Sequence, residues 1–187
     1  MSTIQASIDQ AVQTLESLRA LEPEITRAAA MLRDCLTYGN KILACGNGGS
    51  AGDASDFTTE YVCRFLGDRP AFPAINLTAD GSLLTAVGND YGFEEVFARQ
   101  VCAFGKTGDI VIVISTSGKS RNIIRALEEA RRMHLASIAL LGRDGGDAKG
   151  LATVELIVPS KVTARIQEAH KFLFHLLCEL VEPALKK

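Results

Sequence analysis

Four hydroxyl side chains gather in one short loop of this 187-residue chain, Ser115-Thr116-Ser117-Gly118-Lys119-Ser120. The loop follows an apolar run at 110–114 that is typical of a buried strand, and a helical pattern over about 120–134 comes after it. Hydroxyl donors and the free N–H groups of a helix N-terminus suit a phosphate monoester, whereas a helix cap needs only one hydroxyl. The Gly-Lys-Ser ending is shared with ATP-binding loops, but Val113 stands where that pattern needs glycine. The loop therefore predicts a phosphate site that does not bind ATP.

A second loop, Gly46-Asn47-Gly48-Gly49-Ser50-Ala51, also separates an apolar run from a helical pattern, which extends through Phe57 to about Phe65. Its glycines allow the backbone to approach an anion closely at the start of the helix. The string fits the G-x-G-x-x-A pattern of dinucleotide-binding proteins, but an acidic residue should then end the next strand, where Asn76-Leu77-Thr78 stands instead. From the residues alone, three interpretations stay open: an anion site, a dinucleotide site and a tight turn without a ligand.

Short apolar runs alternate with helical patterns through the middle of the chain. The runs that predict strands are 41–45, 71–75, 110–114, 136–141 and 154–158. Continuous β-branched runs between helices indicate parallel strands buried on both faces, hence an α/β, doubly wound fold with a five-stranded parallel sheet. Long helices are expected at both ends, from Ile4 to about Leu36, where Pro23 separates two helices, and from Thr163 to Leu185. Their apolar faces favour an oligomer interface; the alternative is that they cover the sheet of a monomer.

The composition excludes several classes of protein. Hydrophobic residues make up 47% and charged residues 22% of the chain, which is typical of a globular domain and excludes a disordered chain. A net charge of −2 leaves no large basic field for nucleic acid or an anionic membrane. The five cysteines are scattered and form no C-x-x-C pair, and no apolar run is long enough to span a bilayer. We therefore expect a cytoplasmic protein with no nucleic-acid or membrane partner.

Taken together, the motifs of the chain resemble those of the SIS (sugar isomerase) domain family, and more closely those of the phosphoheptose isomerases. They are Cys45–Ser50, Arg69-Pro70 with Pro73–Ile75, Val87–Phe93, Ser115–Ser120, Asp144–Gly146 and Arg165–His170, in the family order. The resemblance covers nearly the whole chain. It implies a single SIS domain over residues 1–187, a homotetramer, and a helical extension at 1–38 that is used in oligomerisation.

The resemblance also implies an activity and the residues that perform it. The reaction is the aldose–ketose isomerisation of the phosphosugar sedoheptulose 7-phosphate to D-glycero-D-manno-heptose 7-phosphate, on the ADP-heptose route to lipopolysaccharide core. The phosphate would bind Ser115, Thr116, Ser117 and Ser120, and the sugar would contact Asn47, Gly48, Gly49, Ser50, Asn89, Asp90 and Gln167. Glu60 would be the catalytic base and His175 the acid.

One residue departs from the family pattern, and it belongs to the zinc site that the resemblance implies. The ligands to Zn2+ would be Asp56, Glu60, Gln167 and His175, and the family has a histidine where this chain has Asp56. Asp56 and Glu60 stand four positions apart and so share a helix face. A set of three oxygen ligands and one nitrogen weakens selectivity for zinc and would admit manganese or another divalent ion. The alternative is a metal-free site in which Asp56 only caps or solvates its helix.

Two other functions stay open. Some SIS-domain tetramers bind the bacterial replication initiator protein and lack the catalytic glutamate and histidine, and the absence of the metal histidine here fits such a role. The presence of Glu60 and His175 favours an enzyme instead. The remaining interpretation is an isomerase of a different phosphosugar, in which Asp56 changes the site.

Overall fold

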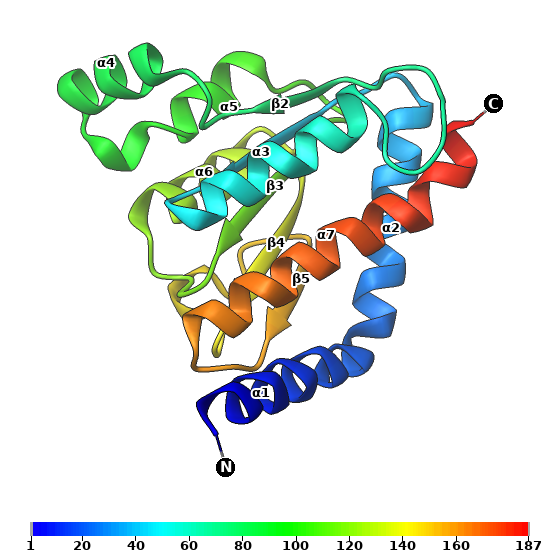
Figure 1. Cartoon of the computed structure of the whole chain (residues 1–187). Helices are drawn as coiled ribbons and strands as arrows, with labels where there is room; N and C mark the ends of the chain where they lie inside the picture. Colours follow the sequence, from blue (N-terminus) through cyan, green and yellow to red (C-terminus); the bar gives the residue numbers. More distant parts are fainter. Residues whose placement is uncertain (1, 187) are drawn as a thin grey trace.

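Five parallel strands form one sheet, in the order β2-β1-β3-β4-β5, in a computed structural model that describes residues 2–186 (Figure 1). The strands are β1 Ile42–Gly46, β2 Ala74–Asn76, β3 Ile110–Ser115, β4 Ala136–Gly142 and β5 Val154–Val158. All neighbouring pairs are parallel, which confirms the predicted doubly wound α/β fold. Both end residues of the predicted domain 1–187, and residue 1 of the predicted extension 1–38, lie outside the described residues.

The central strands have apolar residues on both faces. Every residue of β1 and β3 is buried. Ile110, Ile112 and Ile114 of β3 join one hydrophobic cluster, and the intervening Val111 and Val113 join the other. Because β1 and β3 pair in register along the whole of β1, the loops that follow the two strands begin at neighbouring positions on the same edge of the sheet.

Two helical layers cover the sheet (Figure 1). The helices are α1 Thr3–Ser17, α2 Glu22–Thr37, α3 Gly49–Val62, α4 Gly81–Tyr91, α5 Ala98–Phe104, α6 Arg121–Arg132 and α7 Thr163–Leu185, with 3-10 turns η1 Leu18–Leu21, η2 Phe93–Glu95 and η3 Gly146–Ala148. Buried residues of α2, α3 and α7 share one hydrophobic cluster with the sheet, and those of α5 and α6 share the other. The helices that follow β1 and β3, namely α3 and α6, therefore leave toward opposite faces.

Several boundaries differ from the sequence-based expectation. Pro23 does not separate two helices: it is the second residue of α2, where a proline costs no helical hydrogen bond, and η1 connects α1 to α2. Helix α3 ends at Val62 rather than near Phe65, and β2 is limited to Ala74–Asn76. The sequence pattern does not predict α4 and α5, because α4 buries only Val87 and α5 has only 7 residues.

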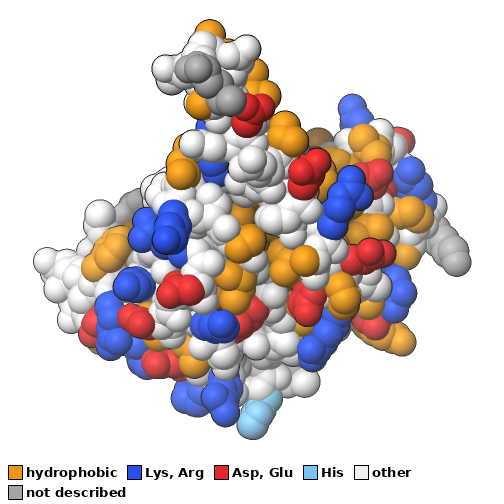
Figure 2. Space-filling model, turned by 90° about the horizontal axis from the view of Figure 1, so that it is seen from below, with side chains coloured by type: hydrophobic (Ala, Val, Ile, Leu, Met, Phe, Trp, Pro, Cys, Tyr) orange, Lys and Arg blue, Asp and Glu red, His pale blue; other side chains and the backbone are white. Residues whose placement is uncertain are grey.

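Helix α1 lies below the sheet in Figure 1 and has no buried residue. Its hydrophobic side chains are exposed along one stripe formed by Ile4, Ile8, Val12 and Leu15. Figure 2, which views the molecule from this side, shows hydrophobic side chains open to solvent between charges of both signs. None of the helices in the described residues has the length and apolar character needed to cross a bilayer. An exposed apolar stripe of this kind is typical of protein-interaction surfaces.

Candidate active site

The loops after β1 and β3 meet at the carboxyl edge of the sheet, where the strand order reverses direction. Ligands of open α/β sheets bind at this place. Asn47 of the first loop and Asn122 of α6 exchange two amide hydrogen bonds of 2.9 Å each. Asn122 is buried and is not among the predicted site residues. It stands next to the apolar Ile123 at the start of the predicted helix, and a polar residue on the buried side of a helix is a signal that could have identified it. The amide pair fixes the two predicted ligand loops relative to each other.

Backbone geometry explains the glycines of the first loop. Gly48, the residue that caps α3, has φ +57° and ψ −122°, a conformation that other residues rarely adopt. A Cβ atom at Gly46 would lie 2.3 Å from the backbone oxygen of Ser50, and one at Gly49 would lie 1.9 Å from Nε2 of Gln167. The loop is therefore a tight turn, and it also leaves room for the Gln167 side chain of α7 to reach its backbone.

The hydroxyl loop after β3 is ordered by two of its own side chains. Ser115 Oγ accepts the backbone N–H of Gly118 at 3.1 Å, and Ser117 Oγ accepts the N–H two residues further on at 3.2 Å. Ser120 begins α6, but its hydroxyl makes no capping hydrogen bond. Thr116 and Ser120 are half-buried. Ser115 and Ser117 hold the shape of the loop as hydrogen-bond acceptors only, so all four hydroxyls keep an O–H group that can donate to a ligand.

A glycine turn after β4 packs directly against the hydroxyl loop. Gly118 has φ +62°, and a Cβ atom there would lie 1.8 Å from the backbone oxygen of Gly145. The N–H of Ala148 donates to the Gly118 carbonyl at 2.9 Å. This close backbone contact explains why the motif Asp144–Gly146 accompanies the hydroxyl loop in the sequence.

Helices α3 and α7 lie side by side and run in the same direction. Gly49 at the start of α3 meets Gln167 near the start of α7, and one to two turns further along, Asp56 pairs with Lys171. Lys171 and His175 follow Gln167 at intervals of four residues, so all three share the face that α7 turns toward α3. We call this arrangement the α3–α7 face.

Lys171 lies at the middle of the α3–α7 face. Its Nζ is 2.5 Å from Oδ2 of Asp56 and 3.4 Å from Oδ1 of Asp53. Asp53 is buried, and its second oxygen has no hydrogen-bond partner among the described residues. Burial raises the pKa of Asp53, whereas Lys171, and more weakly His175, act to lower it. Neither Asp53 nor Lys171 is a predicted site residue, although the spacing of four from Gln167 to Lys171 is a signal that could have found the lysine.

The two predicted catalytic residues project from these neighbouring helices. Glu60 is half-buried and lies near Cys178 of α7: burial raises the pKa of that thiol to about 12, and the Glu60 charge contributes to the rise. The His175 ring, also half-buried, packs against Phe65 and Phe174 with centroids 5.8 and 4.3 Å apart. In residues 2–186 no hydrogen bond or ion pair joins Glu60 to His175. Neither side chain forms a hydrogen bond or an ion pair with any other group in this part of the chain, and both are partly exposed to solvent.

The other histidine of α7 has a different environment. His170 is fully buried, and its Nε2 lies 3.1 Å from the backbone oxygen of Leu141 in β4. Burial lowers the pKa of His170 to about 4. This side chain is therefore a neutral core residue, and His175 is the α7 histidine that is partly exposed to solvent.

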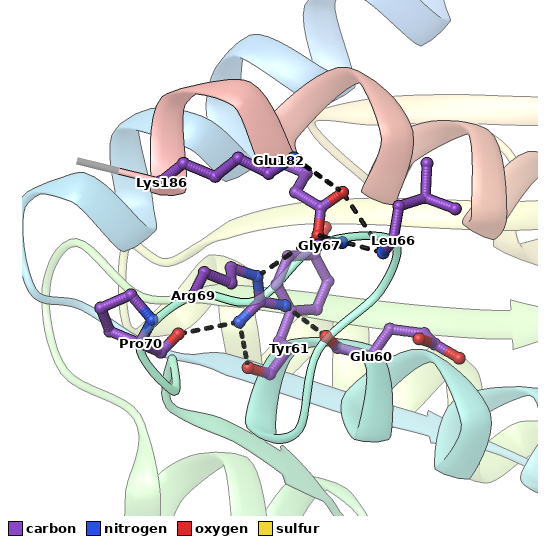
Figure 3. Close-up of polar contacts among 8 residues, drawn as sticks. All are labelled: Glu60, Tyr61, Leu66, Gly67, Arg69, Pro70, Glu182 and Lys186. Atoms are coloured by element: carbon purple, nitrogen blue, oxygen red, sulfur yellow. Dashed lines mark hydrogen bonds and ion pairs between the residues drawn. The ribbon is translucent and has the colours of Figure 1, made fainter.

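A buried ion pair holds the far end of α3 against α7 (Figure 3). The Arg69 guanidinium donates to the backbone carbonyls of Glu60 and Tyr61 in the last turn of α3, and its Nε lies 3.9 Å from the Glu182 carboxylate of α7. Glu182 also accepts the backbone N–H groups of residues 66 and 67. Figure 3 shows the Glu60 carboxylate pointing away from this cluster, which we call the Arg69 clamp. The clamp holds the backbone from which the Glu60 side chain projects.

Known proteins of one family are similar to the chain along its whole length. The SIS domain model matches residues 7–142. A phosphoheptose isomerase from Shewanella loihica is 48% identical over 189 residues, which cover 99% of this chain and 96% of that protein. The chain belongs to the phosphoheptose isomerase family of SIS-domain proteins. The structure of a phosphoheptose isomerase from Francisella tularensis matches with a TM-score of 0.93 at 41% identity and covers 98% of this chain and 100% of that chain. The structure of phosphoheptose isomerase from Neisseria gonorrhoeae matches with a TM-score of 0.89 at 41% identity and covers 96% of this chain and 97% of that chain.

The four residues that the family resemblance names for a metal ion do not converge in this structure. Within residues 2–186, no three side chains of His, Cys, Asp or Glu gather closely enough to hold a metal ion. Asp56 is paired with the Lys171 ammonium, and Gln167 lies against the glycine loop. The residues present therefore do not fit the divalent ion that the family implies.

Asn89 and Asp90 are also separate from the other predicted sugar contacts. Both are exposed on α4, and Asn89 Nδ2 donates to Oδ1 of Asp90 at 2.8 Å. Figure 1 shows α4 at the outer edge of the molecule, away from α7. Within one chain these two residues do not join the loops or the α3–α7 face.

Arg69→Met should destabilise the fold, because it removes the buried cation beside Glu182 and the donors to two carbonyls of α3. We expect the free energy of unfolding, measured by urea denaturation, to fall by about 3–5 kcal/mol. Arg33→Met is the control: its ion pair with Asp34 is exposed, so the loss should stay below about 1 kcal/mol. Equal, small losses in both variants would contradict a structural role of the Arg69 clamp.

Gly118→Ala should disrupt the hydroxyl loop, because the new methyl group would overlap the Gly145 carbonyl oxygen, 1.8 Å away. We expect the affinity for a sugar phosphate, measured by titration calorimetry, to fall about tenfold or more. Gly39→Ala is the matched control, since Gly39 also has a positive φ, +79°, but faces open space. A Gly118 variant that binds as tightly as the Gly39 variant would argue against the loop as the phosphate site.

Proposed function

We propose that the chain is an aldose–ketose isomerase that converts sedoheptulose 7-phosphate to D-glycero-D-manno-heptose 7-phosphate, on the ADP-heptose route to lipopolysaccharide core. One observation carries the proposal: Glu60 and His175 project from the neighbouring helices α3 and α7, which meet the glycine loop at their N-terminal ends, in a chain that is 48% identical to a phosphoheptose isomerase. The hydroxyl loop suits the phosphate end of such a substrate, and the α3–α7 face suits the end that reacts.

The two loops bind the substrate. The hydroxyls of Thr116 and Ser120 and the first N–H groups of α6 hold the phosphate in a loop that Ser115 and Ser117 keep in shape. The sugar contacts Asn47, Gly48, Gly49, Ser50 and, across from α7, Gln167. Binding energy from the phosphate, which does not react, orients the carbons that do.

Glu60 and His175 move the protons of the reaction. The Glu60 carboxylate takes a proton from C1 of the ketose, the C–H electron pair forms the C1–C2 double bond, and the carbonyl pair moves to O2. His175 carries a proton from O1 to O2, because an imidazole both donates and accepts near neutral pH. Glu60 then returns its proton to C2 while O1 becomes the aldehyde oxygen. The sum is an isomerisation that consumes no oxidant or reductant.

No step of this proposal runs through zinc or another divalent ion, because Asp56, Glu60, Gln167 and His175 do not form a site that fits one. The cytoplasmic location expected from the scattered cysteines stays a prediction. A non-catalytic partner of the replication initiator is not favoured, because the relatives that cover the whole chain are named as isomerases.

A homotetramer built on the terminal helices completes the proposal. A groove of about 480 Å³ lies between α1, α2 and α7, and its apolar lining includes Leu15, Leu18 and Leu176. Phe172 and Leu180 of α7, which are exposed, also line it. A second copy of the chain covers this groove and the α1 stripe, since closed symmetric oligomers bury such surfaces. We further propose that Asn89 and Asp90, which are exposed on α4, contact the sugar bound by a neighbouring copy.

Glu60→Gln should abolish turnover and leave binding largely intact, because the amide keeps the shape of the side chain but cannot accept the C1 proton. We expect kcat to fall by about 10²–10⁴-fold, followed by NMR of the aldose signal and of deuterium incorporated from solvent. Glu24→Gln, an exposed glutamate in the first turn of α2, is the control and should behave as wild type. Normal turnover in the Glu60 variant would refute the base assignment.

Ile8→Glu should weaken the tetramer, because it places a charge in the exposed apolar stripe of α1. Light scattering coupled to size exclusion should show four chains per particle in the wild type and smaller species in the variant. Gln13→Glu adds the same charge to an exposed polar position of α1 and should stay tetrameric. A monomeric wild type would contradict the proposed assembly.

A further inference from the structure

An ammonium group contacts one of the four residues for which the family resemblance implies a metal ion. On α7, Lys171 lies four residues after Gln167 and four before His175, and its Nζ is 2.5 Å from Oδ2 of Asp56 on α3. Glu60 stands one turn beyond Asp56 on α3. A fixed positive charge is therefore already present between the two helices that would supply the ligands.

Lys171 is held there by more than one contact. Its Nζ is also 3.4 Å from Oδ1 of the buried Asp53 and 5.1 Å from the ring centroid of Phe174, although 44% of its side chain is exposed. No other ion pair is formed by Asp53 in residues 2–186, so removing the ammonium would leave a buried carboxylate without a cation. This lysine is therefore part of the packed α3–α7 face rather than a free surface side chain.

The Lys171 ammonium and a divalent ion would compete for the same carboxylate. A cation that bound Asp56 would stand beside the ammonium group that already contacts this carboxylate at 2.5 Å, and two positive charges that share one carboxylate repel each other. The side chains of Lys171 and Asp56 are 44% and 54% exposed, so solvent screens part of this repulsion. To admit the ion, Asp56 would have to release Lys171, which would weaken the charge compensation of Asp53 as well. The geometry thus favours the ammonium over the ion.

We propose that the Lys171 ammonium takes the place of the divalent ion in this chain, and that the isomerase works without a metal ion. The inference rests on the proposed function for its catalytic part. When Glu60 removes the C1 proton, negative charge develops on O2 of the substrate, and Lys171 supplies the positive charge that stabilises it. Asp53 and Asp56 act as positioning residues, because they hold the ammonium on the face where the charge develops.

Metal retention by the wild-type protein is the first test. The full-length protein is treated with EDTA, exchanged into buffer, incubated with excess zinc or manganese chloride, desalted and assayed for bound metal by mass spectrometry. We expect no stoichiometric zinc or manganese, and the same turnover of sedoheptulose 7-phosphate before EDTA, after EDTA and after metal addition. Stoichiometric metal together with activity that EDTA removes and metal restores would overturn the inference and leave the proposed function standing.

Substitution of the lysine is the second test. Lys171→Met keeps the length of the side chain without its charge and should lower kcat/KM at least about 100-fold, as does loss of one donor to a developing oxyanion in other enzymes. Lys149→Met, at an exposed lysine outside the site, is the control and should leave kcat/KM unchanged. Thermal unfolding of each variant shows whether it is folded. A folded Lys171→Met protein with wild-type turnover would overturn the inference.

The double variant Asp56→His, Lys171→Met tests the exchange of ammonium for metal directly. It removes the competing charge and supplies a nitrogen ligand, so it should retain stoichiometric zinc where the wild type does not. Zinc binding in this variant is read without any assay of activity, which keeps the test valid if the enzyme assignment fails. Absence of turnover in the wild type under every metal condition would refute the proposed function. Equal zinc retention by the wild type and the double variant would refute the proposal that the Lys171 ammonium takes the place of a divalent ion.

Discussion

The packing of α3 against α7 determines where the candidate side chains of these two helices lie, because it joins residues that are 115 positions apart in the sequence. Phe57 lies at its centre, edge-on to Tyr61 at 5.1 Å and to Phe174 at 5.8 Å between ring centroids. All three rings are buried, and loss of one such side chain typically costs about 3–5 kcal/mol. This apolar packing needs no ligand. The polar groups beside it are therefore positioned before a substrate arrives, as electrostatic catalysis requires.

Two contacts at the ends of this helix pair prevent one helix from sliding along the other. At one end, Gln167 fits against Gly49, which has no Cβ atom to exclude it. At the other end, Arg69 joins the last carbonyls of α3 to Glu182 of α7. A shift by one helical turn, about 5.4 Å, would break both contacts. The position of Glu60 along α7 is therefore fixed through its backbone carbonyl, and its side-chain carboxylate takes no part in this contact.

Local patterns were sufficient to predict the strands and the positions of the loops after β1 and β3, because a buried strand appears as a continuous apolar run and a tight turn at positive φ requires glycine. Helix α4 shows no such pattern, since Val87 is its one buried residue. The contact of Lys171 with Asp53 and Asp56 depends on the register of two helices that are distant in the sequence, and no spacing along the chain specifies that register. For the same reason, the motifs named Asp56 as a metal ligand without indicating that a cation lies beside it.

Charge balance links positions 56 and 171. Asp53 and Asp56 place two carboxylates on adjacent turns of one helix, and burial, together with the charge of Asp56, raises the pKa of Asp53, whereas the Lys171 cation lowers it. Lys171 supplies this cation from α7. A histidine at position 56 would remove the closest partner of the lysine and, when protonated, would repel it. The charge pair between Asp56 and Lys171 therefore explains both the aspartate that departs from the family pattern and the lysine that faces it. Together they keep a positive charge on the α3–α7 face, from which Glu60 also projects.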